Sequence, residues 1–225
     1  MDQKRHQLQG DRAATKQLLD EYIDYLMAHS DSEHPAWNLE MIRSGKRNKW
    51  NYIDGCMITG ILELYEITGE ARFLDFADRF LSGFVEEDGH IRTYDPEEYT
   101  LDNVNPAKNL FPLYDLTGKE KYRKAIELVR SQLSTMPRTP EGNFWHKLIY
   151  PNQVWLDGIY MALPFYMEYE KRFDQEKDCP DICQQIANVE IRMRDPETGL
   201  YYHGYDASRK MYWADPDTGC SPNFW

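Results

Sequence analysis

The sequence has few cysteines and no long apolar run, and each shortage excludes a class of protein. Four cysteines in 225 residues are far too sparse for a disulfide scaffold, so we expect reduced thiols. The longest apolar runs, such as Ile159 to Phe165, are far shorter than the roughly 18 to 20 residues that cross a bilayer. The N-terminal MDQKRHQLQGDR lacks the apolar stretch of a signal peptide. These shortages predict a soluble, cytoplasmic protein.

Basic residues are also scarce. Lysine and arginine number 26 against 38 acidic residues, which gives a formal net charge of −12. Nucleic acids and anionic membranes attract clustered basic side chains, so neither is expected as a partner. Aromatic residues, in contrast, are plentiful: 16 Tyr, 9 Phe and 6 Trp make up 14% of the chain. Flat rings with polar tips pack against the C–H faces of sugars, which favours a carbohydrate ligand.

Apolar side chains recur every three or four residues along most of the chain, which is the period of an amphipathic helix. The pattern predicts helices at about residues 12–29, 51–67, 69–83, 103–116, 122–136, 155–173 and 176–193. In the first of these, one face is formed by Leu18, Tyr22, Tyr25 and Leu26. Strand-like alternation is confined to residues 200–205 and 210–213. We therefore expect an all-α fold with at most one small hairpin, in a single domain over residues 1–225.

A repeat of about 50 residues underlies these helices. Three aligned segments each place an aspartate near their start: Asp54, Asp102 and Asp157. The first two segments continue as LYEITGEARF (64–73) and LYDLTGKEKY (113–122), in which Thr-Gly closes one helix before the next begins. Such helix hairpins either stack as an open solenoid or close into an α/α toroid. Periodicity alone does not choose between the two.

The three aspartates are the first candidates for chemistry. In a ring of hairpins their helix starts share one face, near the favourable dipoles of the helix N-termini. Asp54 has an alternative role as a helix cap. Asp102 lies beside two amides in LDNVNP, whereas Asp157 follows Trp155 among apolar residues that favour a protonated acid. Two carboxylates in unlike surroundings are typical of acid–base catalysis.

Four motifs follow one another in order: LDNVNP (101–106), HKLIYP (146–151), VWLDGIYMALPF (154–165) and TGLYYHGYD (198–206). Together they resemble the unsaturated rhamnogalacturonyl hydrolases, glycoside hydrolase family 105, and more distantly the unsaturated glucuronyl hydrolases of family 88. The resemblance runs from about Trp50 to the last residue. It implies a six-hairpin α/α barrel whose pocket holds a 4,5-unsaturated uronic acid at the end of a short pectin fragment. It implies no metal and no organic cofactor.

The resemblance also implies a reaction. An acid protonates the double bond at carbon 4, water adds at carbon 5, and the resulting hemiketal opens and expels the neighbouring sugar, with rhamnose favoured. Asp157 matches the general acid–base residue, and Asp102 matches a second carboxylate of the pocket. Substrate-binding positions are matched by Tyr52, His146, Lys147, His203 and Trp225. From the residues alone, Tyr52 has an alternative explanation as a core aromatic, His146 as a packed surface histidine and His203 as a turn residue.

In that family this stretch continues as Trp-x-Arg-x-x-Gly-Trp, of which the present sequence holds only the first Trp, Trp225. Six hairpins of about 50 residues need roughly 300 residues, so we expect this chain to supply the N-terminal two-thirds of the barrel. Missing hairpins would leave apolar faces exposed. We therefore expect the 225 residues alone to show weak or no activity and a tendency to associate.

Three other functions remain open. A helical-repeat solenoid would grip a peptide along its concave face. A zinc protein would use Cys179, Cys183, His203 and Cys220, although no second closely spaced pair completes that set. A sugar-binding protein without catalysis would keep affinity for the unsaturated uronyl disaccharide. The sequence leaves the identity of the leaving sugar and the oligomeric state open.

Overall fold

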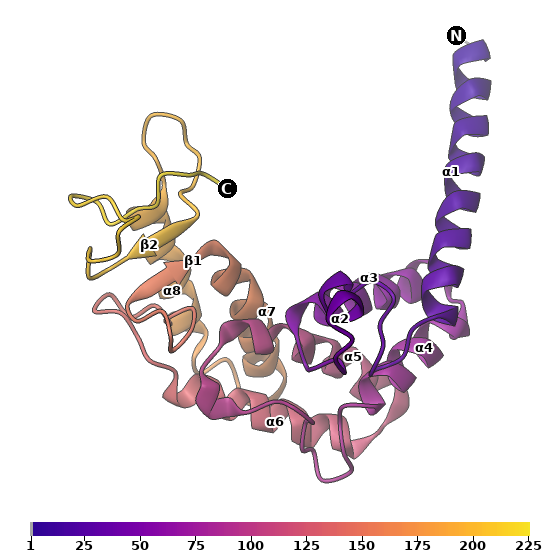
Figure 1. The fold of residues 1–225 in the computed structure, drawn as a ribbon, viewed down its shortest axis with the longest axis horizontal. Helices are drawn as coiled ribbons and strands as arrows, with labels where there is room; N and C mark the ends of the chain where they lie inside the picture. Colours follow the sequence, from indigo (N-terminus) through magenta and orange to yellow (C-terminus); the bar gives the residue numbers. More distant parts are fainter. Residues whose placement is uncertain (1) are drawn as a thin grey trace.

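Helices follow one another along the chain and bend into an open arc (Figure 1). The structure is a computed structural model that describes residues 2–225, with side chains from Ala13 onward. Its α-helices are α1 (Asp2–Ala28), α2 (Leu39–Ser44), α3 (Tyr52–Thr68), α4 (Ala71–Ser82), α5 (Leu110–Thr117), α6 (Glu120–Thr135), α7 (Leu156–Phe173) and α8 (Cys179–Met193). Short 3₁₀ helices are η1 (Pro96–Glu98), η2 (Leu101–Asn103) and η3 (Asn105–Asn109), and the strands are β1 (Gln153–Trp155) and β2 (Gly204–Asp206). The prediction of a mostly helical fold is confirmed. No described helix is long and apolar enough to cross a membrane.

The predicted repeat is visible in how two helices end. α3 stops before Gly69 and α5 before Gly118, and these glycines adopt φ angles of 70° and 65°. Each glycine N–H donates a 2.8 Å hydrogen bond to the carbonyl of a tyrosine four residues earlier, Tyr65 or Tyr114. Glycine suits this position because a Cβ disfavours positive φ. The Thr-Gly pair therefore ends the first helix of a hairpin in both repeats, as the sequence predicted.

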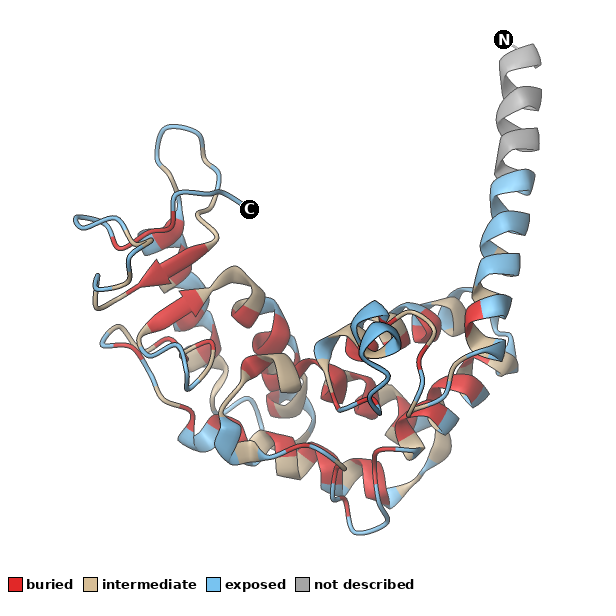
Figure 2. Cartoon of the chain, in the orientation of Figure 1, coloured by how far each residue is buried: buried red, intermediate tan, exposed pale blue. Residues whose placement is uncertain are grey.

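The core lies between consecutive hairpins. Buried side chains come from every α-helix from α3 to α7, for example Ile58, Phe76, Leu113, Tyr122 and Phe165. Figure 2 shows buried residues along each of these helices and exposed residues at most turns. Burial of one such large side chain is worth roughly 1.5–3 kcal/mol. Packing of neighbouring hairpins therefore holds the arc together.

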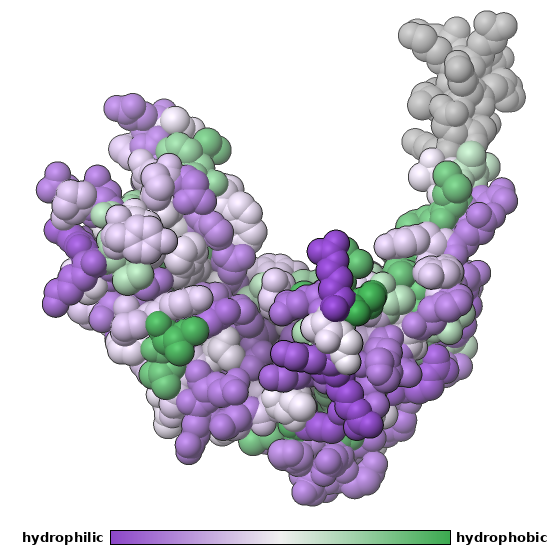
Figure 3. Space-filling model, viewed as in Figure 1, coloured by the Kyte–Doolittle hydropathy of each residue, from purple (hydrophilic) through white to green (hydrophobic). Residues whose placement is uncertain are grey.

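The apolar face predicted for the first helix is buried only near the C-terminal end of that helix. Leu26 is buried there, whereas Leu18, Tyr22 and Tyr25 are 68%, 56% and 56% exposed. The reason is that α1 extends away from the arc, so little of it contacts the rest of the chain (Figure 1). Figure 3 shows hydrophobic side chains on the described part of this helix, while most of the same face of the molecule is hydrophilic.

The sequence prediction of one helix over residues 103–116 is wrong. Residues 101–109 form η2 and η3, and the α-helix begins only at Leu110. Pro106 sits at the start of η3 and has no N–H to give to a longer helix. The segment also packs tightly on α3, since a Cβ built on Gly55 would lie 2.9 Å from the Pro106 backbone. Tertiary packing has therefore replaced the first two turns of the expected helix.

The predicted hairpin between residues 200–205 and 210–213 is also wrong. β2 pairs instead with β1, which lies some fifty residues earlier, with Gln153 opposite Asp206 and Trp155 opposite Gly204. All three residues of β2 are buried. Pairing with β1 inside the fold therefore stabilises the strand more than a local hairpin at the surface would. Residues 210–213 form a loop. Helix α2 was not predicted, because six residues are too few to show a helical period.

Candidate active site

A pairing of two backbone segments brings Asp102 and Lys147 together. The Leu101 N–H donates to the His146 carbonyl at 3.0 Å, and the Leu148 N–H donates to the Tyr99 carbonyl at 3.0 Å. The Lys147 Nζ therefore lies 2.6 Å from Asp102 Oδ2, and the His146 Nε2 lies 3.5 Å from Asp102 Oδ1. The Asp102 side chain is only 17% exposed, so the ion pair is partly screened from water.

The strand pair brings His203 to Asp157. The Leu156 N–H donates to the His203 carbonyl at 3.0 Å, which extends the β1–β2 ladder by one position. His203 Nε2 then lies 2.5 Å from Asp157 Oδ2, at the first turn of α7. Asn223 Nδ2 lies 3.3 Å from His203 Nδ1. An amide NH₂ can only donate, so Nδ1 accepts and Nε2 carries the ring proton that Asp157 receives as a hydrogen bond.

His146 contacts the segments of both pairs, because its Nε2 faces Asp102 and its Nδ1 lies against Gly158, the residue after Asp157. Its side chain is 9% exposed, and its Nδ1 is buried without a hydrogen-bond partner. Burial lowers the pKa of His146, while the negative charges of Asp102 and Asp157 act in the opposite direction. The ring therefore stays neutral in a site that contains two carboxylates. This buried position supports the interpretation of His146 as part of the pocket wall, and it excludes a surface histidine.

An aromatic wall lies next to the carboxylates. The Trp155 ring meets His203 at 5.1 Å and 87°, and it meets Trp213 at 5.2 Å and 59°. On its other side His203 lies 5.1 Å from the ring of Trp225. A cavity of about 500 Å³ opens beside this wall. Its lining consists of His146, Gln153 and five apolar or aromatic residues, which are Tyr150, Trp155, Met211, Tyr212 and Trp213.

Three of these aromatic residues were missed at the level of sequence. Tyr150, Tyr212 and Trp213 lie in turns and bends outside the helices, and the general excess of aromatic residues was the only available signal. Trp155 was considered only as a neighbour that excludes water from Asp157. Their joint position depends on the β1–β2 pairing, which the sequence pattern did not predict.

Asp54 does not belong to this cluster. Its carboxylate is buried and accepts hydrogen bonds from Trp37 Nε1 at 2.8 Å, Asn48 Nδ2 at 2.5 Å and Asn51 Nδ2 at 3.0 Å. The cap of α3 is Asn51, whose side chain accepts from the Asp54 N–H. Burial raises the pKa of Asp54, and the three hydrogen bonds oppose the rise. Asp54 is therefore a structural residue that ties α3 to the segment before it, and it is not itself the cap.

Tyr52 is the first residue of α3 and is 39% exposed, so it is not a core aromatic. Among the described residues, no hydrogen bond, ion pair or ring contact links its side chain to Asp102, His146 or Asp157. Its backbone carbonyl accepts from Asn105 Nδ2 at 3.4 Å, which places it beside η3. A role of Tyr52 in substrate binding stays a prediction.

The zinc alternative finds no support in the geometry. Cys220 Sγ lies 3.2 Å from the Arg192 carbonyl, and Cys179 Sγ lies 3.4 Å from Met167 Sδ. His203 is bound instead to Asp157. All four cysteines are free thiols, as predicted.

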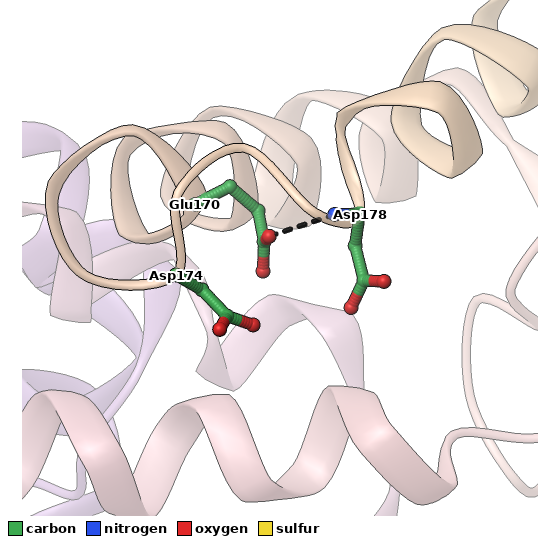
Figure 4. Close-up of side chains that lie close together, drawn as sticks. All are labelled: Glu170, Asp174 and Asp178. Atoms are coloured by element: carbon green, nitrogen blue, oxygen red, sulfur yellow. Dashed lines mark hydrogen bonds between the residues drawn. The ribbon is translucent and has the colours of Figure 1, made fainter.

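One group of acidic side chains does meet at the junction of α7 and α8. Figure 4 shows Glu170, Asp174 and Asp178 turned toward one another. The Asp178 N–H donates to Glu170 Oε2 at 2.8 Å. Arg130 Nη2 lies 3.2 Å from Glu170 Oε1 and 2.7 Å from Asp178 Oδ2. The guanidinium already forms ion pairs with two of the three carboxylates, so the cluster serves to join the two helices.

Residues 18–225 match the family described as Glycosyl Hydrolase Family 88. The chain belongs to this family. Over 175 residues the family 88 chain is 26% identical to "Unsaturated rhamnogalacturonyl hydrolase YesR" of Bacillus subtilis (strain 168), an alignment that covers 73% of this chain and 49% of YesR. The resemblance inferred from the four motifs is therefore confirmed.

Solved structures agree with this assignment. A family 105 glycoside hydrolase of C. acetobutylicum ATCC 824 is 42% identical with a TM-score of 0.78, and the match covers 89% of this family 88 chain and 54% of that one. A family 88 glycosyl hydrolase from Bacteroides vulgatus shares the fold, with a TM-score of 0.51 and 21% identity over 79% of this chain and 50% of that chain. These neighbours support the prediction of the α/α toroid class. The chain spans about half the length of these relatives.

Proposed function

We propose that this family 88 chain carries the catalytic groups of an enzyme that hydrates unsaturated uronyl disaccharides derived from pectin. The leaving sugar is rhamnose in this proposal. One observation carries it: two carboxylates with unlike partners lie in segments that both contact His146, with Asp157 bound to a histidine and Asp102 bound to a lysine. Similarity to an unsaturated rhamnogalacturonyl hydrolase supports the substrate class.

In the first step Asp157 acts as the general acid. Its carboxyl proton forms the new C–H bond at carbon 4 of the unsaturated sugar, and the π electrons leave positive charge at carbon 5 and the ring oxygen. His203 holds Asp157 Oδ2, which leaves Oδ1 free to deliver the proton. General acid–base assistance of this kind typically contributes about 10²- to 10⁴-fold in rate.

In the second step water adds at carbon 5. Its oxygen forms the new C–O bond, and its proton passes to the Asp157 carboxylate, which restores the acid. The product is a hemiketal that opens without further help and releases the neighbouring sugar. Because the proton is returned to the same residue, the reaction needs no second acid. No carboxylate nucleophile is required, in contrast to retaining glycosidases.

Asp102 and Lys147 bind the substrate in this proposal. Lys147 uses one of its three N–H groups on Asp102 and keeps two for the uronate carboxylate. Asp102 accepts hydrogen bonds from sugar hydroxyls and keeps the lysine in place. His146 is neutral and contributes shape and polarity at the base of the site without adding charge.

The test uses the absorbance of the conjugated double bond of unsaturated galacturonyl-rhamnose, which hydration removes. We expect only slow loss of absorbance with the chain, because it spans about half the length of its relatives, and a rate at least about 10²-fold lower still for Asp157→Asn. Asp88→Asn is the control, since Asp88 is an exposed turn residue that binds the His90 N–H. Unchanged absorbance combined with calorimetric binding of the disaccharide would replace this proposal by a sugar-binding function. Absence of both would reject an unsaturated disaccharide as the ligand.

The free thiols of Cys56, Cys179, Cys183 and Cys220 support a cytoplasmic location within the same proposal, because oxidising compartments favour disulfides. Cell fractionation with an antibody against the chain measures this directly. Recovery in an extracytoplasmic fraction would contradict it.

A further inference from the structure

Asp206, the last residue of β2, organises the loop that follows it. Its side chain is fully buried. Oδ1 accepts hydrogen bonds from the Ser208 N–H at 2.9 Å and the Ser208 hydroxyl at 2.7 Å. Oδ2 accepts from the N–H groups of Lys210 and Met211, both at 2.9 Å. We name residues 207–213 the aromatic loop, and four of its polar groups thus converge on one carboxylate.

The aromatic loop is also tied to a distant segment at its start, where the Ala207 N–H donates to the Asn152 carbonyl at 2.9 Å. Its last residues close a turn of their own, in which the Ala214 N–H donates to the Met211 carbonyl at 3.0 Å. Between these two hydrogen bonds Arg209 adopts a positive φ of 57°, which a non-glycine residue takes only when its surroundings enforce it. The Asp206 carboxylate therefore organises the loop, because it accepts hydrogen bonds from backbone N–H groups that have no partner in a helix or strand.

The loop places its last three residues at the cavity beside the proposed catalytic site. Met211, Tyr212 and Trp213 line that cavity. Trp213 packs against Trp155, whose ring in turn meets His203, the partner of Asp157. A chain of contacts thus runs from Asp206 through two indole rings to the catalytic pair. Tyr212 is 94% exposed, so its ring is open to solvent.

The chemistry of the cavity favours a neutral sugar ring. Its lining holds no lysine, arginine, aspartate or glutamate among the described residues, and its one titratable imidazole, His146, has a pKa lowered by burial. Flat aromatic rings pack against the C–H faces of a sugar, and their polar tips and Gln153 offer hydrogen bonds. The charged pair that suits a uronate, Asp102 and Lys147, lies outside this lining.

We propose that Asp206 is a positioning residue that holds the aromatic loop as the wall of the subsite for the leaving sugar. This inference rests on the proposed function, because it assigns the unsaturated uronate to the carboxylates and the next sugar to the aromatic cavity. Asp206 touches neither sugar. It acts through Trp213 and the backbone of Lys210 and Met211.

The chain contains a matched control. Asp195 also organises a turn with its carboxylate, which accepts from the Thr198 N–H at 2.9 Å and from the Thr198 hydroxyl at 2.5 Å. Its turn contributes no residue to the aromatic cavity. Asp195→Asn therefore removes a comparable turn carboxylate without moving the aromatic wall.

The first experiment is spectroscopic and needs no activity. Two indoles 5.2 Å apart and inclined at 59° give an exciton couplet in the far-ultraviolet circular dichroism spectrum. We expect Asp206→Asn to lose this couplet while the helical signal is retained, and Asp195→Asn to keep both. Trp213→Ala identifies the couplet, since it removes one of the two rings. A couplet unchanged in Asp206→Asn would overturn the positioning role.

The second experiment separates the subsite from the catalytic groups. It compares unsaturated galacturonyl-rhamnose with the methyl glycoside of the unsaturated galacturonic acid, which has no leaving ring. We expect Asp206→Asn and Trp213→Ala to raise KM for the disaccharide about tenfold with kcat within about twofold, which corresponds to loss of one ring contact. KM for the methyl glycoside should stay unchanged. Equal effects on both substrates would overturn the subsite assignment.

The two proposals fail in different ways. If the unaltered chain turns over neither compound, the proposed reaction fails, and calorimetry of the same two compounds then replaces KM as the measured affinity. If the unaltered chain binds the disaccharide more tightly than the methyl glycoside and Trp213→Ala removes that difference, the subsite is still supported. Trp213 is only partly buried, so its removal should leave the fold intact. Equal affinity of the unaltered chain for both compounds contradicts it, whatever the catalytic result. Trp213→Ala also decides the matter if Asp206→Asn does not fold.

Discussion

The Nδ1 atom of His146 lies 2.7 Å from the point where a Cβ on Gly158 would stand. Gly158 is the residue directly after Asp157 in the first turn of α7, so the imidazole rests against the backbone that carries the proposed acid. Leu101 Cδ1 lies 3.2 Å from the same point. The absence of a side chain at residue 158 is therefore what lets the Asp102 segment approach α7.

Gly158→Ala is expected to destabilise the fold and to lower activity together. The added methyl group forces His146 or the backbone to move, and overpacking of this kind costs about 1–3 kcal/mol. Urea unfolding measures the loss. Gly60→Ala is the control, because Gly60 lies in α3 with nothing within 4 Å of its Cβ position. We expect that change to stabilise the chain by about 0.5–1 kcal/mol. Equal stability of the two variants would mean that the site is looser than the geometry indicates.

The stability of the chain is expected to fall as pH drops below about 6.5, the ordinary pKa of histidine. Burial lowers the pKa of His146, so the unfolded chain binds a proton in this range that the folded chain does not. Stability is therefore fully present above the ordinary pKa and is lost as pH falls toward the lowered one, by at most about 1.4 kcal/mol per pH unit. His146→Gln should flatten the curve of unfolding free energy against pH between 7 and 5. The same substitution at His90, an exposed turn residue, should not. An unchanged slope in His146→Gln would show that this histidine titrates alike in both states.

Tyr52 and Asp54 are expected to behave in opposite ways although only one residue separates them. Asp54→Ala leaves the donors of Trp37, Asn48 and Asn51 unpaired inside the fold. Loss of a buried acceptor costs about 1–3 kcal/mol, so the denaturant midpoint should fall while kcat of the folded fraction is kept. Tyr52→Ala should leave the midpoint unchanged, because the ring is 39% exposed, and should raise KM. A loss of kcat in Asp54→Ala at full stability would place Asp54 in the active site after all.

Substitution of Arg130 is expected to lower the stability of the fold more than substitution of most other charged residues. Glu170 is fully buried and has this guanidinium as its counter-charge. Arg130→Met leaves a buried carboxylate unpaired, which costs about 3–5 kcal/mol. Arg72→Met removes an exposed arginine that pairs with Asp24 and Glu70, so its effect should stay within about 1 kcal/mol. Thermal unfolding of both variants checks the contrast. The double variant Arg130→Met, Glu170→Met should recover stability, and failure to do so would assign the loss to packing of the arginine stem.

Most of the helices could be predicted from local pattern. The stretch from Tyr52 to Thr68 and the one from Leu156 to Phe173 carry their own apolar period, and the first ends at its own Thr-Gly signal. The sequence also identified the residues that gather around His146, since Asp102, Lys147, Asp157 and His203 belong to ordered motifs. These features are local or rest on motif resemblance, so they do not require knowledge of the tertiary fold.

The sequence by itself determined the helical hairpins, the Thr-Gly ends and the chemical identity of the candidate site. The tertiary structure alone decided that Asp54 is buried away from Asp102 and Asp157, although the three align in the repeat. It also decided that β2 pairs with β1, which carries His203 to Asp157 and Trp213 to Trp155. The physical reason is that the pairing of a strand depends on the burial of its side chains and on hydrogen bonds to backbone far away in the sequence. Local periodicity contains no information about either.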